Sequence, residues 1–274
     1  EPGVLMIAEE STAWPKVTGA VEDEGLGFDY KWNMGWMNDF IYYMSLDPIF
    51  RTANHGALTF SMVYAYSEDY ILTLSHDEVV HGKASMIGKM PGDREQQFAN
   101  LRAAYGFMLA HPGKKLLFMG QDFGQLHEWD EKVSLDWHLT EEDLHKDLQN
   151  YVRDLLHIYQ KHPALYESDD DWDGFSWINA NDGDRSIYSF VRYAKNHKKS
   201  LLFVCNFTPV ARPDYRVGVP KRGNYTLILD NEHGAYKTGE KAPVFKAVKS
   251  ECDGQPYSVA LPLSAYGTAI LRFS

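Results

Sequence analysis

The sequence predicts an α/β region with a parallel sheet at residues 1–165 and an antiparallel β-sandwich, an all-β region, at residues 166–274. Two observations support this division. In the first region, short apolar runs alternate with helical patterns, which is typical of βα units. In the second region, short alternating strands follow one another closely, with Gly, Asn and Asp turns between them. A chain of 274 residues is long enough to bury a sizeable core.

The elements of the first region follow from the spacing of apolar residues. The apolar runs predict four strands, at residues 4–8, 28–32, 70–74 and 116–119. A helix is expected near residues 34–44, and a second contains Phe98, Leu101, Tyr105, Met108 and Leu109 on one face. A capping-box pattern at residues 140–143 predicts the start of a third helix, which Pro163 ends.

In the second region, the alternation of apolar and polar residues predicts six short strands. They are expected at residues 175–179, 186–193, 201–207, 225–229, 257–263 and 269–273. Asp169-Asp170-Asp171 marks the change from the first region, and Asn181 to Asp184 reads as a turn.

Composition excludes several classes of protein. With 38 acidic and 27 basic side chains, the net charge of -11 argues against a nucleic-acid partner. No apolar run is long enough to suggest a membrane protein. Cys205 and Cys252 form no CxxC motif, which favours a cytoplasmic location. Because the chain enters an apolar run directly after Glu1-Pro2, we expect it to be a piece of a longer protein.

Polar side chains follow three of the predicted parallel strands where each strand ends. The first strand runs into Glu9-Glu10-Ser11, the third into Ser75-His76-Asp77-Glu78 and the fourth into Gly120-Gln121-Asp122. The carboxyl ends of parallel strands share one edge, and a (β/α)8 barrel builds its active site there. This edge is therefore the predicted site of chemistry.

Two carboxylates on different strands, Glu9 and Asp77, suit the cleavage of a glycosidic bond. This chemistry needs one protonated acid for the leaving oxygen and one carboxylate facing an oxocarbenium-like transition state. The pKa of the acid would have to rise from about 4.3 towards 6 or 7. The alternative is that Glu9 and Glu10 are solvated loop residues that cap the next helix, and for Glu10 we favour it.

The sequence favours a neutral ligand without a metal. His76 and His81 are five residues apart and lie on different faces of a helix, and His127-Glu128 lacks a second histidine, so no zinc site is predicted. Four tryptophans near strand ends could stack on sugar faces, with core packing as the alternative. They are Trp32, Trp36, Trp129 and Trp137.

The motifs resemble those of the α-amylase superfamily, in the form found in 1,4-α-glucan (glycogen) branching enzymes. Amylases carry Asn-His-Asp at the fourth signature region, whereas this chain has Ser75-His76-Asp77-Glu78-Val79-Val80-His81-Gly82-Lys83. The resemblance covers nearly the whole chain. Other segments that carry it are Ala8-Glu9-Glu10-Ser11-Thr12, Lys31-Trp32-Asn33-Met34-Gly35-Trp36-Met37, Met90-Pro91-Gly92-Asp93, residues 98–102 and 113–120, Glu128-Trp129, Ser134-Leu135-Asp136-Trp137 and Asn206-Phe207-Thr208-Pro209.

The resemblance implies roles for individual residues. Glu9 matches the general acid/base, His76 the substrate-binding histidine, and Asp77 the aspartate that stabilises the transition state. Trp32, Asn33 and Trp129 are expected to contact the substrate. Branching enzymes commonly carry Glu at the position of Asp122, so the role of Asp122 is open.

The family's nucleophile, an aspartate in a Gly-x-Arg-x-Asp motif, has no counterpart in this sequence. The resemblance therefore implies the C-terminal half of a (β/α)8 barrel, strands five to eight, followed by the sandwich. The implied partners are α-1,4-glucan or glycogen and the missing N-terminal half of the same enzyme, and no cofactor is implied. The alternatives are an α-glucan hydrolase, against which Ser75 argues, and a non-catalytic glucan-binding fragment.

Overall fold

In the computed structural model, which describes residues 3–231 and 242–274, the first region contains a parallel sheet. Glu1 and Pro2 lie outside the described residues. The strands β1 (Ile7–Ala8), β2 (Tyr30–Trp32), β3 (Tyr70–Leu74) and β4 (Lys114–Leu117) pair in the order β1-β2-β3-β4. Every pairing is parallel, so the predicted parallel sheet is confirmed.

The first predicted strand is wrong in length. Residues 4–8 were expected to form a buried strand, but only Ile7–Ala8 pair with β2, and of this run Ala8 alone is buried. Val4, Leu5 and Met6 are between 56% and 62% exposed. Among the described residues, β1 has a strand on one side only and pairs with β2 through just two residues, so the side chains of the preceding segment are left largely uncovered. The fourth predicted strand is displaced by two residues, because the pairing with β3 starts at Lys114.

The three predicted helices are present as α1 (Met34–Ser45), α4 (Arg94–Ala110) and α5 (Asp143–Lys161). Two short helices were not predicted, α2 (Pro48–Arg51) and α3 (Gly56–Phe60). The capping box expected at residues 140–143 does not form, because residues 137–141 make a 3-10 turn and Thr140 donates to the carbonyl of Trp137. A capping box does form at the start of α4, between Asp93 and Gln96.

The second region is an antiparallel β structure of two sheets around their own apolar core. One sheet has the order β10-β9-β12-β7-β6-β5 and the other pairs β11 with β8. Two of the strands were not predicted: β8, because exposed polar residues in its first half hide the alternation, and β10, because it has only three residues. The strands are β5 (Phe175–Asp182), β6 (Ile187–Arg192), β7 (Ser200–Asn206), β8 (Arg212–Val219), β9 (Asn224–Leu229), β10 (Val244–Lys246), β11 (Tyr257–Leu263) and β12 (Gly267–Phe273).

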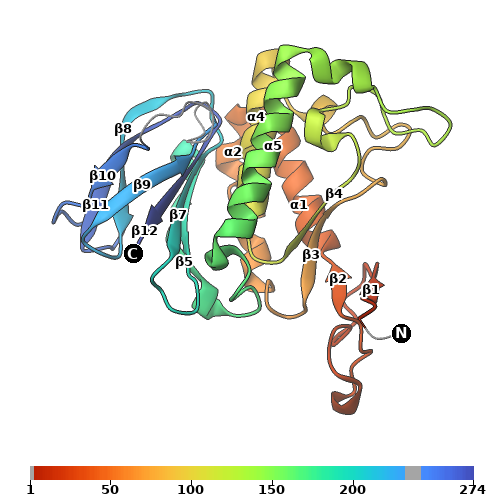
Figure 1. Ribbon diagram of the computed structural model, residues 1–274, viewed down its shortest axis with the longest axis horizontal. Coiled ribbons are helices and arrows are strands. Elements are labelled where there is room, and N and C mark those ends of the chain that lie inside the picture. Colours follow the sequence, from red (N-terminus) through yellow and green to blue (C-terminus); the bar gives the residue numbers. More distant parts are fainter. Residues whose placement is uncertain (1–2, 232–241) are drawn as a thin grey trace.

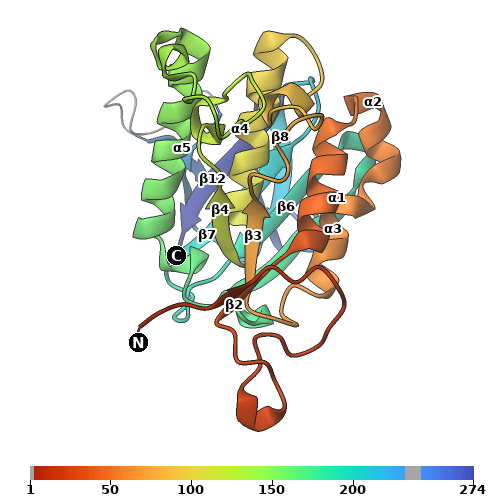
Figure 2. The ribbon, with the colours of Figure 1, turned by 90° about the vertical axis from the view of Figure 1, so that its right-hand side faces the viewer.

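The helices lie between the parallel sheet and the β-sandwich (Figure 1). Helix α4 contacts β7 and β12, and one continuous apolar core joins the helices to the face of the six-stranded sheet that points away from β8 and β11. Figure 2 shows the parallel strands in front of α4, with the helices behind the sheet. Since α4, α5 and α1 cover this one face, the sheet is held against the sandwich through the helix layer.

The side chain of Arg51 is fully buried in this helix layer. Its Nη1 donates to Oδ1 of Asn100 on α4 at 2.9 Å and to the carbonyl of Phe207 after β7 at 2.8 Å. Its Nη2 donates to the carbonyl of Met44 on α1 at 2.8 Å. Burial lowers the pKa of Arg51, and its guanidinium carbon lies 5.5 Å from the centroid of the Tyr43 ring. One side chain thus connects two helices with the sandwich.

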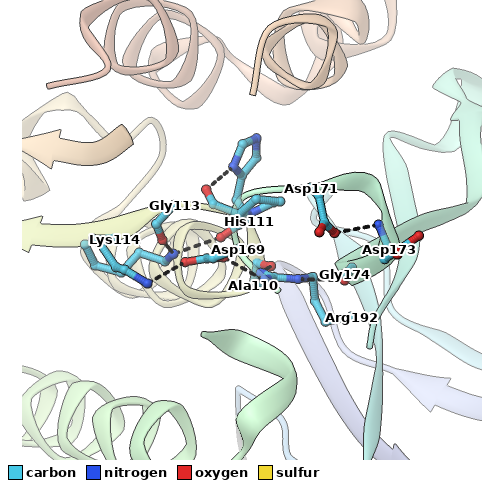
Figure 3. Close-up of polar contacts among 11 residues, drawn as sticks. Ala110, His111, Gly113, Lys114, Asp169, Asp171, Asp173, Gly174 and Arg192 are labelled. Carbon is cyan, nitrogen blue, oxygen red and sulfur yellow. Dashed lines mark hydrogen bonds and ion pairs between the residues drawn. The ribbon is translucent and has the colours of Figure 1, made fainter. Parts of the chain in front are cut away.

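A second buried polar contact joins the sheet to the sandwich at Asp169 (Figure 3). Arg192 of β6 reaches Oδ1 of Asp169 at 2.7 Å and the carbonyl of Ala110 at 2.8 Å, while Lys114 of β4 reaches Oδ2 at 3.2 Å. Burial on its own would raise the pKa of Asp169, but the charges of Arg192, Lys115 and Lys114 outweigh it and lower the pKa to about 2. Asp169 is therefore held as an anion.

Arg51→Lys should lower the free energy of unfolding by about 3 kcal/mol, because one ammonium cannot replace three hydrogen bonds from a planar guanidinium. Urea denaturation measures this change. Arg94→Lys, at an exposed position on α4, is the matched control and should change stability very little. If Arg51→Lys lowered the free energy of unfolding no more than Arg94→Lys does, the role of Arg51 in joining the helices to the sandwich would be refuted.

Stability should fall in acid as Asp169 takes up a proton. Its pKa is lower in the folded chain than in the unfolded chain, so its contribution is present above about pH 4 and is lost as the pH falls towards 2. Urea denaturation between about pH 4 and pH 2 measures this loss of unfolding free energy. In Asp169→Asn the loss should be smaller by about 2 kcal/mol, because the titrating carboxyl group is gone. Asp170→Asn, an exposed neighbour, should retain the loss of the unsubstituted chain.

Candidate active site

The carboxyl ends of the four parallel strands meet at one edge of the sheet. Glu9 directly follows β1, Asn33 follows β2, and Ser75-His76-Asp77 follow β3. Because β2 separates β1 from β3, the chains carrying Glu9 and Asp77 lie about 10 Å apart. The fold thus brings the two predicted catalytic carboxylates to the same edge of the sheet.

His76 and Asp77 project from the turn that follows β3. Their side chains are 43% and 45% exposed, and Nε2 of His76 lies 3.3 Å from Oδ1 of Asp77. The backbone N–H of Val79 donates to the carbonyl of His76 at 2.9 Å, which closes the turn. The pair is therefore accessible to a ligand and held close together.

Trp129 is the sequence-predicted aromatic that lies nearest to this pair. Its ring centroid is 5.8 Å from that of His76 and 5.2 Å from that of Phe118, both edge-on. Its backbone N–H donates to the carbonyl of Val79 at 2.8 Å, so the segment after β4 is tied to the turn after β3. Trp129 consequently packs against the imidazole and borders the site.

Glu128 joins the same two segments with its carboxylate. It accepts hydrogen bonds from the backbone N–H groups of Ala84 at 2.6 Å and Gly82 at 3.0 Å, and these bonds lower its pKa. Beside them is an open cleft of about 500 Å³. It is lined by Val80, His81 and residues 127–132.

Glu9 and Glu10 differ sharply in their surroundings. The side chain of Glu9 is exposed, whereas Glu10 accepts from the buried Nζ of Lys31 at 2.8 Å and from the N–H of Thr12 at 2.8 Å. Hydrogen bonds from Lys31 and then Thr12 lower the pKa of Glu10 to about 2. The expectation that Glu10 is a solvated helix cap is therefore wrong, because its carboxylate forms an ion pair with Lys31 of β2. Of the two carboxylates, Glu9 is the one that is open to a ligand.

The two predicted substrate contacts at the end of β2, Trp32 and Asn33, differ in their burial. Trp32 is half-buried at the end of the strand, whereas Asn33 is only 2% exposed. Oδ1 of Asn33 accepts from the backbone N–H of Trp36 at 2.9 Å and so caps α1. The side chain of Asn33 is occupied in holding the helix, which the sequence pattern alone did not indicate.

The remaining candidates divide between core and surface. Trp36 is buried and stacks on Phe40, whereas Trp137 is 59% exposed. Asp122 accepts a weak hydrogen bond from Gln149 on α5 at 3.4 Å. Within residues 3–231 and 242–274, no cluster of three or more His, Cys, Asp or Glu side chains could hold a metal ion. In the same part of the chain, no helix is both long and apolar enough to cross a bilayer.

Asn33→Ala should lower the free energy of unfolding by about 1 kcal/mol, because it removes the cap of α1. Asn33→Asp keeps an oxygen that can accept from Trp36 and should leave stability nearly unchanged. Asn38→Ala, at an exposed position of the same helix, is the control. Equal stability of the Ala and Asp variants at position 33 in chemical denaturation would contradict the capping role.

Comparison with known proteins supports a common origin over the length of the chain. Residues 177–274 match the family described as alpha amylase, C-terminal all-beta domain. The chain is 56% identical over 274 residues to the 1,4-alpha-glucan branching enzyme GlgB of Butyrivibrio fibrisolvens and 56% identical over 277 residues to that of Aquifex aeolicus. In both cases the match covers 99% of this chain and 43% of the relative, so the chain spans less than half the length of these curated relatives.

A solved structure shows the same fold at low sequence identity. The pullulanase type I from Bacillus subtilis, complexed with maltose, aligns with a TM-score of 0.70 and 16% identity. The alignment covers 100% of this chain and 40% of the pullulanase. This likeness concerns the fold alone, whereas the matches to branching enzymes confirm the resemblance that the sequence motifs indicated.

Proposed function

We propose that this relative of the 1,4-α-glucan branching enzymes forms the C-terminal part of such an enzyme, acting on α-1,4-glucan or glycogen in the cytoplasm. The observation that carries the proposal is the edge of the parallel sheet, where Glu9 and the His76–Asp77 pair are exposed on nearby strand ends. The neighbouring carboxylates Glu10 and Glu78 are held by other groups. The exposed residues are those that the family resemblance assigns to catalysis.

The proposed reaction is a double displacement with retention of configuration. A nucleophilic carboxylate attacks the anomeric carbon as the glycosidic bond breaks, and Glu9 gives its proton to the departing oxygen. Glu9 then removes the proton from the 6-hydroxyl of an acceptor glucan, whose oxygen attacks the anomeric carbon and displaces the carboxylate. Asp77 stabilises the positive charge in both transition states. One glycosidic bond replaces another, so no metal or nucleotide is needed.

We further propose that the nucleophile and the remaining barrel strands come from a segment outside this sequence. Each outer strand of the parallel sheet, β1 and β4, has a neighbour on one side only among the described residues. An apolar groove of about 380 Å³ lies along β4 between α4 and α5, and Val4 to Met6 are exposed beside β1. Unpaired edges and apolar surface of this kind favour completion by further parallel strands.

A chimera tests the assignment of Glu9 and Asp77. The chain would replace the matching part of the Butyrivibrio fibrisolvens relative, and branching would be followed by the fall of iodine absorbance with amylose. Glu9→Gln and Asp77→Asn should each reduce the rate at least about a hundredfold, because a general acid and a transition-state charge are lost. Glu22→Gln, at an exposed position away from the strand ends, should be as active as the parent chimera.

Either outcome of the chimera experiment is informative. A parent chimera that folds but does not branch would refute the proposed function. A fully active Glu9→Gln variant would show instead that another residue supplies the proton.

The chain by itself should self-associate and should not branch amylose. Exposed strand edges and apolar side chains drive association, and without the nucleophile no glycosyl-enzyme can form. Light scattering over a range of concentrations, together with the iodine assay, tests this on residues 1–274. A monomer with branching activity would place the nucleophile within this chain and contradict the proposal.

A further inference from the structure

Two buried side chains lie directly beneath the exposed His76–Asp77 pair. Ser75 is 3% exposed and Glu78 is 7% exposed. Oε2 of Glu78 accepts from the backbone N–H of Ser75 at 2.6 Å and from its hydroxyl at 2.8 Å. The same hydroxyl oxygen accepts from the N–H of Asp77 at 3.2 Å. These hydrogen bonds form a closed chain around the two exposed residues, which we call the Ser75–Glu78 clamp.

The clamp has a physical reason to stay closed. A buried carboxylate is costly unless it accepts hydrogen bonds, and bonds to a charged oxygen are shorter and stronger than neutral ones. Opening the clamp would leave Glu78 without both donors of Ser75. The turn is also closed from the other side, by the bond from the N–H of Val79 to the carbonyl of His76. The backbone that carries His76 and Asp77 is therefore fixed at both ends.

We propose that Ser75 and Glu78 are positioning residues that hold Asp77, and with it His76, in the orientation required by the transition state. A serine suits this position because one oxygen both donates to Glu78 and accepts from Asp77. The inference rests on the proposed function, since it concerns the same site. It assigns Ser75 and Glu78 no contact with substrate, so their effect must pass through the backbone of Asp77.

The test uses Ser75→Ala, Glu78→Gln and the conservative Ser75→Thr in the chimera described above. Ser75→Ala and Glu78→Gln should lower kcat about tenfold, the amount expected for one lost charge-assisted hydrogen bond. KM for amylose should not change. Ser75→Thr retains the hydroxyl and should recover most of the rate. Glu95→Gln, in the exposed first turn of α4, is the matched carboxylate control and should behave as the parent.

A second measurement does not depend on activity. Hydrogen–deuterium exchange of the peptide covering residues 75–80 should be faster in Ser75→Ala and Glu78→Gln than in the unsubstituted chain, with exchange elsewhere unchanged. Unchanged exchange in this peptide would overturn the clamp.

The outcomes separate the two proposals. If the parent chimera branches and Asp77→Asn does not, full activity of Ser75→Ala and Glu78→Gln refutes the positioning role alone. If the parent chimera does not branch, the proposed function fails and the catalytic part of this inference fails with it, whereas the clamp itself is still judged by exchange. A fall in kcat that Ser75→Thr does not recover would show a packing defect in place of a lost hydrogen bond.

Discussion

The buried guanidinium of Arg51 determines how the helix layer meets the β-sandwich. Its three hydrogen bonds reach α1, α4 and the chain after β7, and its burial leaves it no water as an alternative partner. Such a group is stable only while all these elements are in place, because each lost bond exposes a charge to an apolar core. The parallel sheet lies on the other face of the same helices, so this contact, together with the apolar core and the ion pairs of Asp169, helps to fix its position relative to the sandwich.

The direction of the strands then places the site. In a parallel sheet all carboxyl ends lie at one edge, so β1, β2 and β3 deliver Glu9, Asn33 and the residues after Leu74 to the same place. The helices return the chain across one face of the sheet and leave this edge open. Segments after β3 and β4 are joined to each other through Glu128 and Trp129, which limits the movement of the cleft wall.

Much of this arrangement could be predicted from the sequence, because strong periodic patterns reflect burial. The three long helices and the parallel sheet were predictable from apolar spacing. The length of β1 was not, since an apolar run such as 4–8 looks like a buried strand whether or not a neighbour covers it. The strand β8 was hidden by its first residues, Arg212-Pro213-Asp214, of which Pro213 and Asp214 are exposed and interrupt the apolar alternation.

At the site too, the sequence pattern predicts where a residue lies along the chain but not which residue it contacts. Asp77 and Glu9 could be proposed because their position after a strand is visible in the sequence. The roles of Asn33 and Glu10 depend on contacts with Trp36 and Lys31, and spacing did not reveal either contact. Only a structure shows that Asn33 is a cap and that Glu10 is an ion-pair partner.

Polar residues that look alike in the sequence thus fall into two groups, those bonded within the protein and those open to a ligand. Glu10, Glu78 and Asn33 each accept hydrogen bonds from the protein itself and hold a strand end or a turn in place. Glu9, His76 and Asp77 lie beside them and remain open to a ligand. A reactive group must be free to meet its substrate and yet stay within a fraction of an ångström of the right position. A flexible exposed side chain cannot meet both needs alone, so the backbone beneath it must be fixed by neighbours that are themselves fully bonded. Under the proposed function, the bound side chains that flank the open ones in Glu9-Glu10 and Ser75-His76-Asp77-Glu78 would satisfy that requirement.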